Sequence, residues 1–286
     1  MELVKAAETP ARPRLSDAKK QPVRGLVTVV VPTFNRAGLL PRAVRSVFEQ
    51  AYRPLELIVV DDCSEDETQA VLAPWAANGR LTVIRHEKNL GVSAARNTGI
   101  RAGQGEFVAF LDSDDEWRPG KIEAQVDFFG ENPDQVLVQT QERWMRKGRR
   151  VNPGQKHLKK SGDIFIDSVA LCLISPSAVM LRRSLFAEVG LFDENLPAAE
   201  DYDLWLRVLA RYPAGLIDRE LVIRHGGRPD QLSARPGLDV YRAAALEKIL
   251  NLPLSPERRQ AAALELERRR SIYEAGRRKR TGKVIE

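Results

Sequence analysis

The sequence predicts an α/β protein in which helices flank a Rossmann-like, mostly parallel central sheet. Short apolar runs rich in β-branched residues, such as residues 26–31, alternate with segments whose apolar residues recur at helical spacing. Strands and helices that alternate in this way form βαβ units with parallel strands. Several of the runs end in polar or acidic residues. Because ligands of open α/β sheets bind outside the carboxyl ends of the strands, we expect the functional site at this edge.

The first half of the chain supplies most of the regular pattern. Apolar runs predict strands at residues 26–31, 55–60, 81–84 and 107–111. Apolar residues at helical spacing predict helices at residues 39–48, 68–77, 92–102 and 119–129. Pro119 suits the first turn of the last helix, because backbone N–H groups there have no partner within the helix.

The second half is less regular. Its predicted strands are residues 136–138, 178–181 and 215–223, the last of them at an edge of the sheet. Its predicted helices are residues 184–189, 203–210, 240–250 and 256–279. Residues 143–160 are strongly basic, contain glycine and lack periodicity, which indicates a long loop or flap.

We divide the chain into three parts. Residues 1–24 mix proline, lysine, arginine and glutamate without periodicity, which is typical of a disordered leader. Residues 25–235 form one α/β domain with a regular half, residues 25–130, and an irregular half, residues 131–235. Residues 236–286 form a helical, basic tail.

Composition excludes several classes of protein. Cys63 and Cys172 are too few for a disulfide framework or a four-cysteine zinc site, which favours a reducing, cytoplasmic location. No apolar stretch approaches the roughly 18 residues that a membrane span needs, and the first residues lack the apolar core of a signal peptide. Nearly all of the net charge of +6 lies after residue 256, where ten Lys and Arg face five Glu. A nucleic-acid surface more often covers the folded face, so no nucleic-acid partner is expected.

The segment Asp112-Ser113-Asp114-Asp115 follows a buried strand and carries three carboxylates in four residues. No adjacent lysine or arginine neutralises their mutual repulsion, whereas a hard divalent cation such as Mg²⁺ or Mn²⁺ would. A solvated loop that caps a helix is the alternative, since aspartate is favoured at such caps. The position at a strand end, in line with a second acidic strand end, favours the metal.

That second strand end is Asp61-Asp62. A carboxylate there can accept hydrogen bonds from a nucleobase or a ribose, and the alternative is a turn that opens the next helix. The chain contains neither the glycine-rich dinucleotide motif nor the P-loop. A nucleotide on this sheet would therefore be held through carboxylates and a cation.

Four segments in this order resemble the family-2 nucleotide-sugar glycosyltransferases of the GT-A fold. They are VPTFNR (31–36), VVDDCS (59–64), NLGVSAARN (89–97) and FLDSDDEW (110–117). The resemblance covers about residues 26–235. It implies a GT-A fold in which residues 25–130 bind the nucleotide sugar and residues 131–235 form the acceptor region, ahead of the helical tail.

The resemblance also implies roles for individual residues. Asp114 would bind the metal, together with Asp112 and with His225, whose alternative is an ordinary loop histidine. Arg96 would either face the nucleotide pocket or lie on a helix surface. The residues expected to contact the nucleotide sugar are Pro32, Thr33, Asn35, Asp61, Asp62, Arg96, Asp112 and Ser113.

The family places a catalytic base in an acidic pair that opens a helix, and AEDYDLWLR (199–207) resembles that motif. Asp201 would be the base that takes the proton of the attacking hydroxyl, with Glu200 as second choice. Helix capping is the alternative role for Glu200 and Asp203. Trp205 is expected in the core. One base without a covalent nucleophile predicts a single displacement that inverts the anomeric carbon.

The sequence thus predicts a metal-dependent inverting glycosyltransferase that uses Mn²⁺ or Mg²⁺. Its donor would be a nucleotide sugar, best a UDP-sugar, and its acceptor a hydroxyl of a glycan, a lipid-linked molecule or a small molecule. The alternatives are a sugar-nucleotide pyrophosphorylase, which would need a glycine-rich basic loop after the first strand, and a non-catalytic interaction protein of the same fold. The basic clusters at residues 268–270 and 277–280 could contact an anionic membrane peripherally, although a solvated helix face is favoured.

Overall fold

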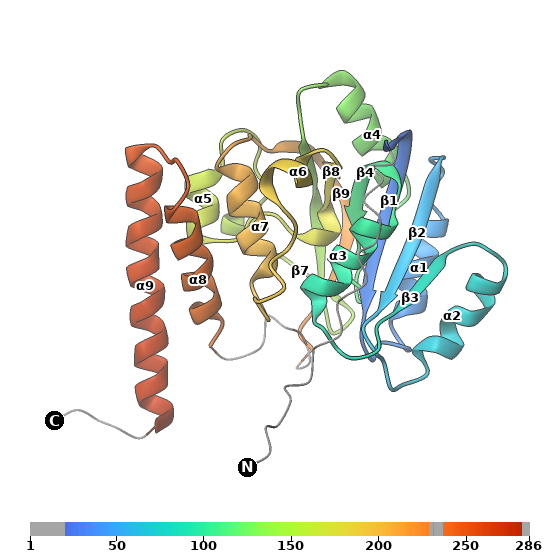
Figure 1. The fold of residues 1–286 in the computed structure, drawn as a ribbon, viewed down its shortest axis with the longest axis horizontal. Helices are drawn as coiled ribbons and strands as arrows, with labels where there is room; N and C mark the ends of the chain where they lie inside the picture. Colours follow the sequence, from blue (N-terminus) through green and yellow to red (C-terminus); the bar gives the residue numbers. More distant parts are fainter. Residues whose placement is uncertain (1–20, 229–230, 232–236, 282–286) are drawn as a thin grey trace, which may run out of the picture.

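A computed structural model of the protein describes residues 21–228, 231 and 237–281. Within these residues, nine strands form one sheet that runs through the middle of the molecule (Figure 1). The short strand β7 (Arg149–Val151) pairs only with β6. The order of the other eight strands is β3 (Thr82–Arg85), β2 (Leu55–Asp61), β1 (Val23–Thr33), β4 (Gly105–Phe110), β8 (Val179–Arg182), β6 (Leu137–Arg146), β9 (Gly215–Gly226) and β5 (Glu116–Trp117).

The four strands from the first half of the chain are parallel to one another, as predicted. Val29 of β1 is in register with Leu57 of β2 on one side and with Ala109 of β4 on the other. Both faces of β1, β2 and β4 are largely buried, which is why these strands read as continuous apolar runs rather than as an alternating pattern. Their carboxyl ends lie at one edge of the sheet.

The rest of the sheet is mixed. Strand β8 is antiparallel to both β4 and β6, whereas β9 runs parallel to β6 and antiparallel to β5. The expectation of an edge strand at residues 215–223 was wrong, because β9 pairs with β6 along its length and with β5 through Val222 and Ile223.

Helices cover both faces of the sheet (Figure 1). One apolar cluster packs Val29 against α1 and α4, and the other packs Val30 against α3 and the helices of the second half. The two valines are neighbours in β1, so the alternation of side chains along the strand separates the two clusters. The helices are α1 (Leu40–Phe48), α2 (Thr68–Ala77), α3 (Val92–Ala102), α4 (Lys121–Glu131), α5 (Phe165–Ala170), α6 (Leu185–Val189), α7 (Glu200–Leu209), α8 (Leu238–Leu250) and α9 (Pro256–Thr281).

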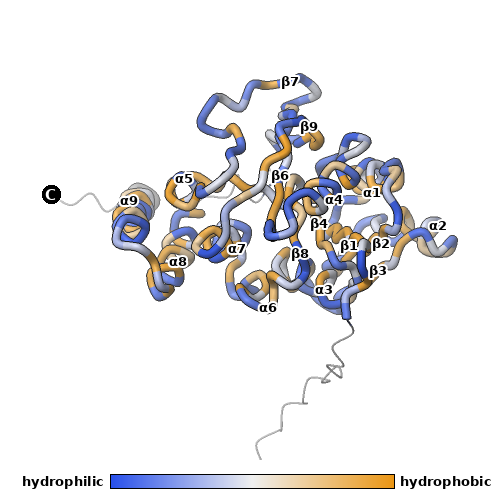
Figure 2. Tube along the Cα trace, turned by 90° about the horizontal axis from the view of Figure 1, so that it is seen from above, coloured by the Kyte–Doolittle hydropathy of each residue, from blue (hydrophilic) through white to orange (hydrophobic). Residues whose placement is uncertain are grey.

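The prediction of a loop over residues 143–160 was wrong for its first half. Strand β6 continues to Arg146 and turns back into β7, and a short 3₁₀ turn follows at Gln155–His157. The polar residues of β6 do not form an apolar run, so the sequence pattern did not predict this part of the strand. Pairing with β9 stabilises it instead. The hairpin extends away from the body of the molecule and is largely hydrophilic (Figure 2).

The C-terminal helices pack onto the domain. Helix α9 lies against α8 and α5 (Figure 1). The arginines of α9 form ion pairs within this layer, for example between Arg269 and Asp239 at 2.8 Å and between Arg270 and Glu247 at 2.7 Å. None of the described helices combines the length and the apolar character that crossing a bilayer requires. Most of the predicted leader, residues 1–20, lies outside the described residues, and β1 begins at Val23.

Candidate active site

A cavity of about 1360 Å³ opens at the carboxyl ends of β1, β2 and β4. It continues past the start of α7 toward β6, β9 and α8, so both halves of the domain and helix α8 contribute to its wall. The polar residues at the carboxyl ends of the parallel strands thus line one cavity, as the strand order predicts.

The carboxylates of Asp112, Asp114 and Asp115 gather at one end of this cavity. One carboxylate oxygen from each lies within 4.8 Å of the others. Asp115 is fixed from behind, because Ser177 Oγ donates to it at 2.8 Å and the backbone N–H of His225 donates at 2.9 Å.

The surroundings of these carboxylates disfavour their negative charge. Burial, followed by the charges of Asp114 and Asp112, raises the pKa of Asp115 well above its usual value. Burial and Asp114 raise the pKa of Asp112 as well, although Arg96 opposes the shift. Three hard oxygen donors that repel one another form a donor set that fits a Mg²⁺ or Mn²⁺ ion. Asp114 also accepts hydrogen bonds from Arg228 and, at 3.2 Å, from Gln231.

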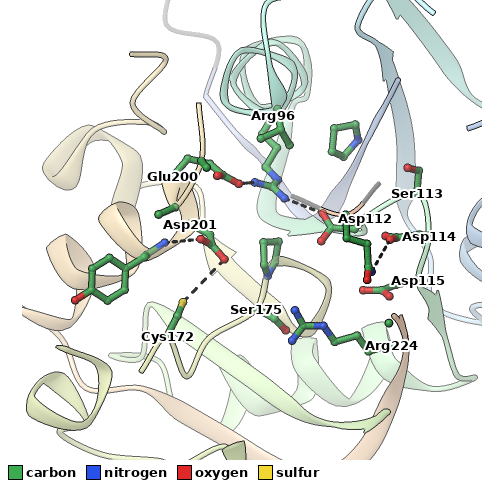
Figure 3. A pocket seen from close by; sticks show the side chains of 18 of the residues that line it. Arg96, Asp112, Ser113, Asp114, Asp115, Cys172, Ser175, Glu200, Asp201 and Arg224 are labelled. Carbon is green, nitrogen blue, oxygen red and sulfur yellow. Dashed lines mark hydrogen bonds and ion pairs between the residues drawn. The ribbon is translucent and has the colours of Figure 1, made fainter. Parts of the chain in front are cut away.

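Arg96 is buried and links the two ends of the site. Its guanidinium donates to Asp112 at 2.7 Å and to Glu200 at 2.6 Å (Figure 3). Burial lowers the pKa of Arg96, but the charges of Asp112 and Glu200 more than offset this and raise it. Of the two orientations expected for Arg96, the structure has the one that faces the cavity.

The two carboxylates at the start of α7, those of Glu200 and Asp201, have different surroundings. Glu200 is buried and held by Arg96, and burial, followed by the charge of Asp201, raises its pKa. Asp201 faces the cavity, where its carboxylate accepts the N–H of Tyr202 at 2.7 Å and lies 3.9 Å from the sulfur of Cys172 (Figure 3). Asp201 therefore keeps room for a ligand, whereas Glu200 does not. Trp205 is in the core, as expected.

Asp62 lines the cavity and Asp61 does not. Asp62 accepts hydrogen bonds from the backbone N–H groups of Leu90 and Gly91 at 2.8 and 2.7 Å, and from His86 at 2.7 Å. The carboxylate of Asp61 is fully buried and is bonded to Ser64 and Gln69. The expectation that Asp61 contacts the nucleotide is thus not supported by its position, because neighbouring residues of a strand point to opposite sides.

The remaining nucleotide-side candidates line the cavity, namely Pro32, Thr33, Asn35 and Ser113. Asn35 has φ of 52°, a conformation that asparagine tolerates. It ties two strand ends together, because its N–H donates to Ser64 and its side-chain oxygen accepts from Glu65. The hydroxyl oxygen of Thr33 is buried without a hydrogen-bond partner.

The structure does not bring the His225 side chain to the carboxylates. Its imidazole lies 3.9 Å from Glu116, and it is neither part of the acidic cluster nor of the cavity wall. Burial and the charge of Arg42 lower the pKa of His225. His225 stays a predicted metal ligand that lies outside the acidic cluster in this structure, whereas its strand neighbour Arg224 lines the cavity.

Sequence reasoning missed a buried charged group around Glu142 of β6. Glu142 lies 3.4 Å from the ammonium of Lys159 and 3.8 Å from Arg224, and it accepts hydrogen bonds from Ser175 and from the indole of Trp144. Burial alone would raise the pKa of Glu142, but Lys159 and Arg224 lower it to about 2. The alternating pattern of β6 was the one signal for this group, since it places Glu142 and Trp144 on the same face.

Comparison with known proteins assigns the family. A model described as glycosyl transferase family 2 matches residues 28–190. The chain belongs to this family. A Bacillus subtilis member, TuaG, named for teichuronic acid biosynthesis, is 30% identical over 188 residues, which are 65% of this chain and 73% of TuaG. A Rickettsia conorii protein named as an uncharacterized glycosyltransferase is 34% identical over 215 residues, 75% of this chain. The chain spans only about a third of that relative's length.

Solved structures of glycosyltransferases share the fold of this family member. Residues 1–349 of TarS from S. aureus, in complex with UDP-GlcNAc, superpose with a TM-score of 0.70 at 23% identity over 86% of this chain and 72% of that chain. A mannosyltransferase from Pyrobaculum calidifontis, in complex with GDP-Man and Mn²⁺, gives a TM-score of 0.65 at 19% identity over 94% of this chain and 77% of that one. The GT-A fold predicted from the sequence is thereby confirmed.

Proposed function

We propose that the protein is a metal-dependent inverting glycosyltransferase that transfers a sugar from a nucleotide sugar, best a UDP-sugar, to a hydroxyl acceptor. One observation carries the proposal: Asp201 and the cluster of Asp112, Asp114 and Asp115 face one cavity from opposite sides, with Arg96 between them. Such a cavity can hold a donor diphosphate at one end and an acceptor at the other. The family and the UDP-GlcNAc complex of a structural neighbour support this choice.

The strand ends supply the donor side. A carboxylate has roughly four lone-pair sites, and three donors already reach Asp62 from its own loop. Asp62 can accept one further donor, such as the N–H of a nucleobase. The loop holds Asp62 rigidly for this contact, which lowers the entropy lost on binding.

Asp112 and Asp114 would hold a Mn²⁺ or Mg²⁺ ion, with Asp115 behind them. When bound, the ion supplies positive charge to the diphosphate that leaves. The chain adds its own charge, because Arg96 lies beside Asp112 and Arg224 lines the same wall. These arginines also hold the carboxylates in place.

Asp201 is the general base of the proposed reaction, and Glu200 positions Arg96. A hydroxyl attacks well only when a positioned group takes its proton. Asp201 lies in the first turn of α7 and faces the cavity, where it can reach an acceptor hydroxyl. A single carboxylate beside the attacking hydroxyl supports one displacement with inversion.

A thermal-shift screen tests this proposal. The full chain is heated with UDP-, GDP- and TDP-sugars, each with and without Mn²⁺, and the best donor is then assayed for release of the nucleotide. We expect a rise in melting temperature for one nucleotide class only when Mn²⁺ is present. If no nucleotide sugar shifts the melting temperature and none is hydrolysed, the chain is a non-catalytic member of the family and the proposal fails.

A further inference from the structure

Helix α8, which sequence analysis assigned to the tail, contributes a charged residue to the cavity. Arg242 is half-buried and lines the cavity wall. Among residues 21–228, 231 and 237–281 it has no hydrogen bond or ion pair. The nearby carboxylates of Asp239 and Glu265 are already engaged, since Arg269 binds them at 2.8 and 2.5 Å.

Arg242 lies at the Asp201 end of the cavity. The Cys172 sulfur, 3.9 Å from the Asp201 carboxylate, marks this position. Burial and Asp201 raise the pKa of Cys172, whereas the charges of Lys159 and Arg242 lower it. The charges of Asp201, Lys159 and Arg242 therefore all act on one thiol.

The cations near this end differ in their partners. Glu142 is the one carboxylate within ion-pair distance of Lys159 and Arg224 in the described chain, so it serves two cations. Lys159 is further held by the carbonyl of Leu173 and the hydroxyl of Ser175, at 3.0 and 3.1 Å. Arg242 remains as a half-buried cation in the cavity wall. A guanidinium in such a place binds planar oxyanions with paired hydrogen bonds.

We infer that Arg242 binds an oxyanion group of the acceptor, a phosphate or a carboxylate, close to the hydroxyl that Asp201 deprotonates. The inference rests on the proposed function, because it names the acceptor class of that site. Lys159 adds positive potential around the same group. Acceptors that carry such a group bind here in preference to neutral sugars.

Binding of small probes tests the inference directly. Glycerol phosphate and glucuronate are titrated into the full chain by NMR, with glycerol and glucose as their neutral counterparts. UDP and Mn²⁺ are present so that anions do not enter the diphosphate end. We expect one anionic probe to bind at least about tenfold more tightly than its neutral counterpart, a difference of about 1.4 kcal/mol. Which anion shows the preference distinguishes a phosphorylated acceptor from an acidic sugar.

Arg242→Gln is compared with a control variant that loses the same charge elsewhere, so that the role of Arg242 is separated from general electrostatics. Arg242→Gln should remove most of the preference for the anion, and Arg242→Lys should keep part of it. Arg270→Gln is the control, because Arg270 is exposed and pairs with Glu247 on the outside of α8 and α9. That control should bind the probes as the unmodified chain does. Melting temperatures of all three variants show that they are folded.

Several results would overturn the inference. They are an anion that binds no better than its neutral counterpart, a preference that survives in Arg242→Gln, and an equal loss in Arg270→Gln. A fourth is an equal fall in kcat for neutral and anionic acceptors in Arg242→Gln, since Arg242 would then act on Asp201. Failure of UDP and Mn²⁺ to bind would instead contradict the proposed function. The titration without them would still report on Arg242.

Discussion

The two ends of the cavity are built in opposite ways. The acidic end takes Asp112, Asp114 and Asp115 from one strand terminus, and no cation within that segment balances them. The Asp201 end takes Lys159 and Arg242 from segments far apart in the chain, and Arg242 has no ion-pair partner among the described residues. The first end offers carboxylate oxygens to a cation from outside, and the second offers a guanidinium to an anion from outside. The difference in charge therefore orients two different substrates in one cavity.

The largest expected effect tests the division of labour between Glu200 and Asp201. Asp201→Asn keeps the shape of the side chain but cannot take a proton, so the turnover number should fall about a thousandfold. Turnover is measured as nucleotide release with a saturating acceptor. Asp127→Asn, on the exposed side of α4, should retain full turnover. An Asp201→Asn enzyme with normal turnover would remove Asp201 as the base.

The acidic end is tested by its affinity for Mn²⁺. Asp114→Asn removes one charged oxygen donor of three, and Mn²⁺ should bind about a hundredfold more weakly. Electron paramagnetic resonance of free Mn²⁺ measures the affinity without any assay of transfer. Asp134→Asn, an exposed aspartate, should leave it unchanged. Equal affinities for all three proteins would place the metal site elsewhere.

The link between the two ends is tested through Arg96. Arg96→Met leaves Glu200 buried and Asp112 partly buried without their cation, so the free energy of unfolding should fall by about 3 kcal/mol. Urea denaturation followed by circular dichroism measures it. Arg101→Met on the same helix removes an exposed pair with Glu194 at 3.4 Å and should change stability by less than about 0.5 kcal/mol. Similar losses in both variants would show that Arg96 does not bridge the site.

Lys121 is a second cation without an ion-pair partner among the described residues. Unlike Arg242, it is fully buried, so no ligand can reach it. It donates to Gln125 at 2.7 Å and lies over the ring of Trp117. Burial lowers the pKa of Lys121 well below its usual value. Folding must therefore release its proton or bury its charge. Lys121→Met should raise the free energy of unfolding by about 1 to 2 kcal/mol near pH 7.

The pH dependence of that gain has a defined sign. The native pKa of Lys121 lies below the unfolded value of about 10.4, so the unfolded chain binds more protons and wild-type stability rises with pH up to that value. The advantage of Lys121→Met should shrink as pH approaches 10 in urea denaturation. Lys88→Met, at an exposed position, is the control. A gain independent of pH would mean that packing, rather than the proton, causes it.

The parallel half of the fold was predictable because its signals are local. Strands 26–31 and 107–111 are buried on both faces, so their apolar runs identify them without knowledge of their neighbours. Strand β6 was missed beyond residue 138 because its polar residues are held by pairing with β9, about 80 residues later in the chain. The same holds for the candidate site. Asp62, Asp112 and Asp114 could be predicted because they follow strand ends, whereas no local motif marks Glu142 or Arg242.

The amino-acid sequence alone determined the family, the strand ends and the carboxylates that follow them, because these depend on spacing along the chain. Only the tertiary structure decided which of two adjacent carboxylates is free, since Arg96 from α3 binds Glu200 and leaves Asp201 open to the cavity. It also left His225 outside the acidic cluster and brought Arg242 of α8 to the site. Such choices depend on partners distant in the sequence, and packing brings those partners together.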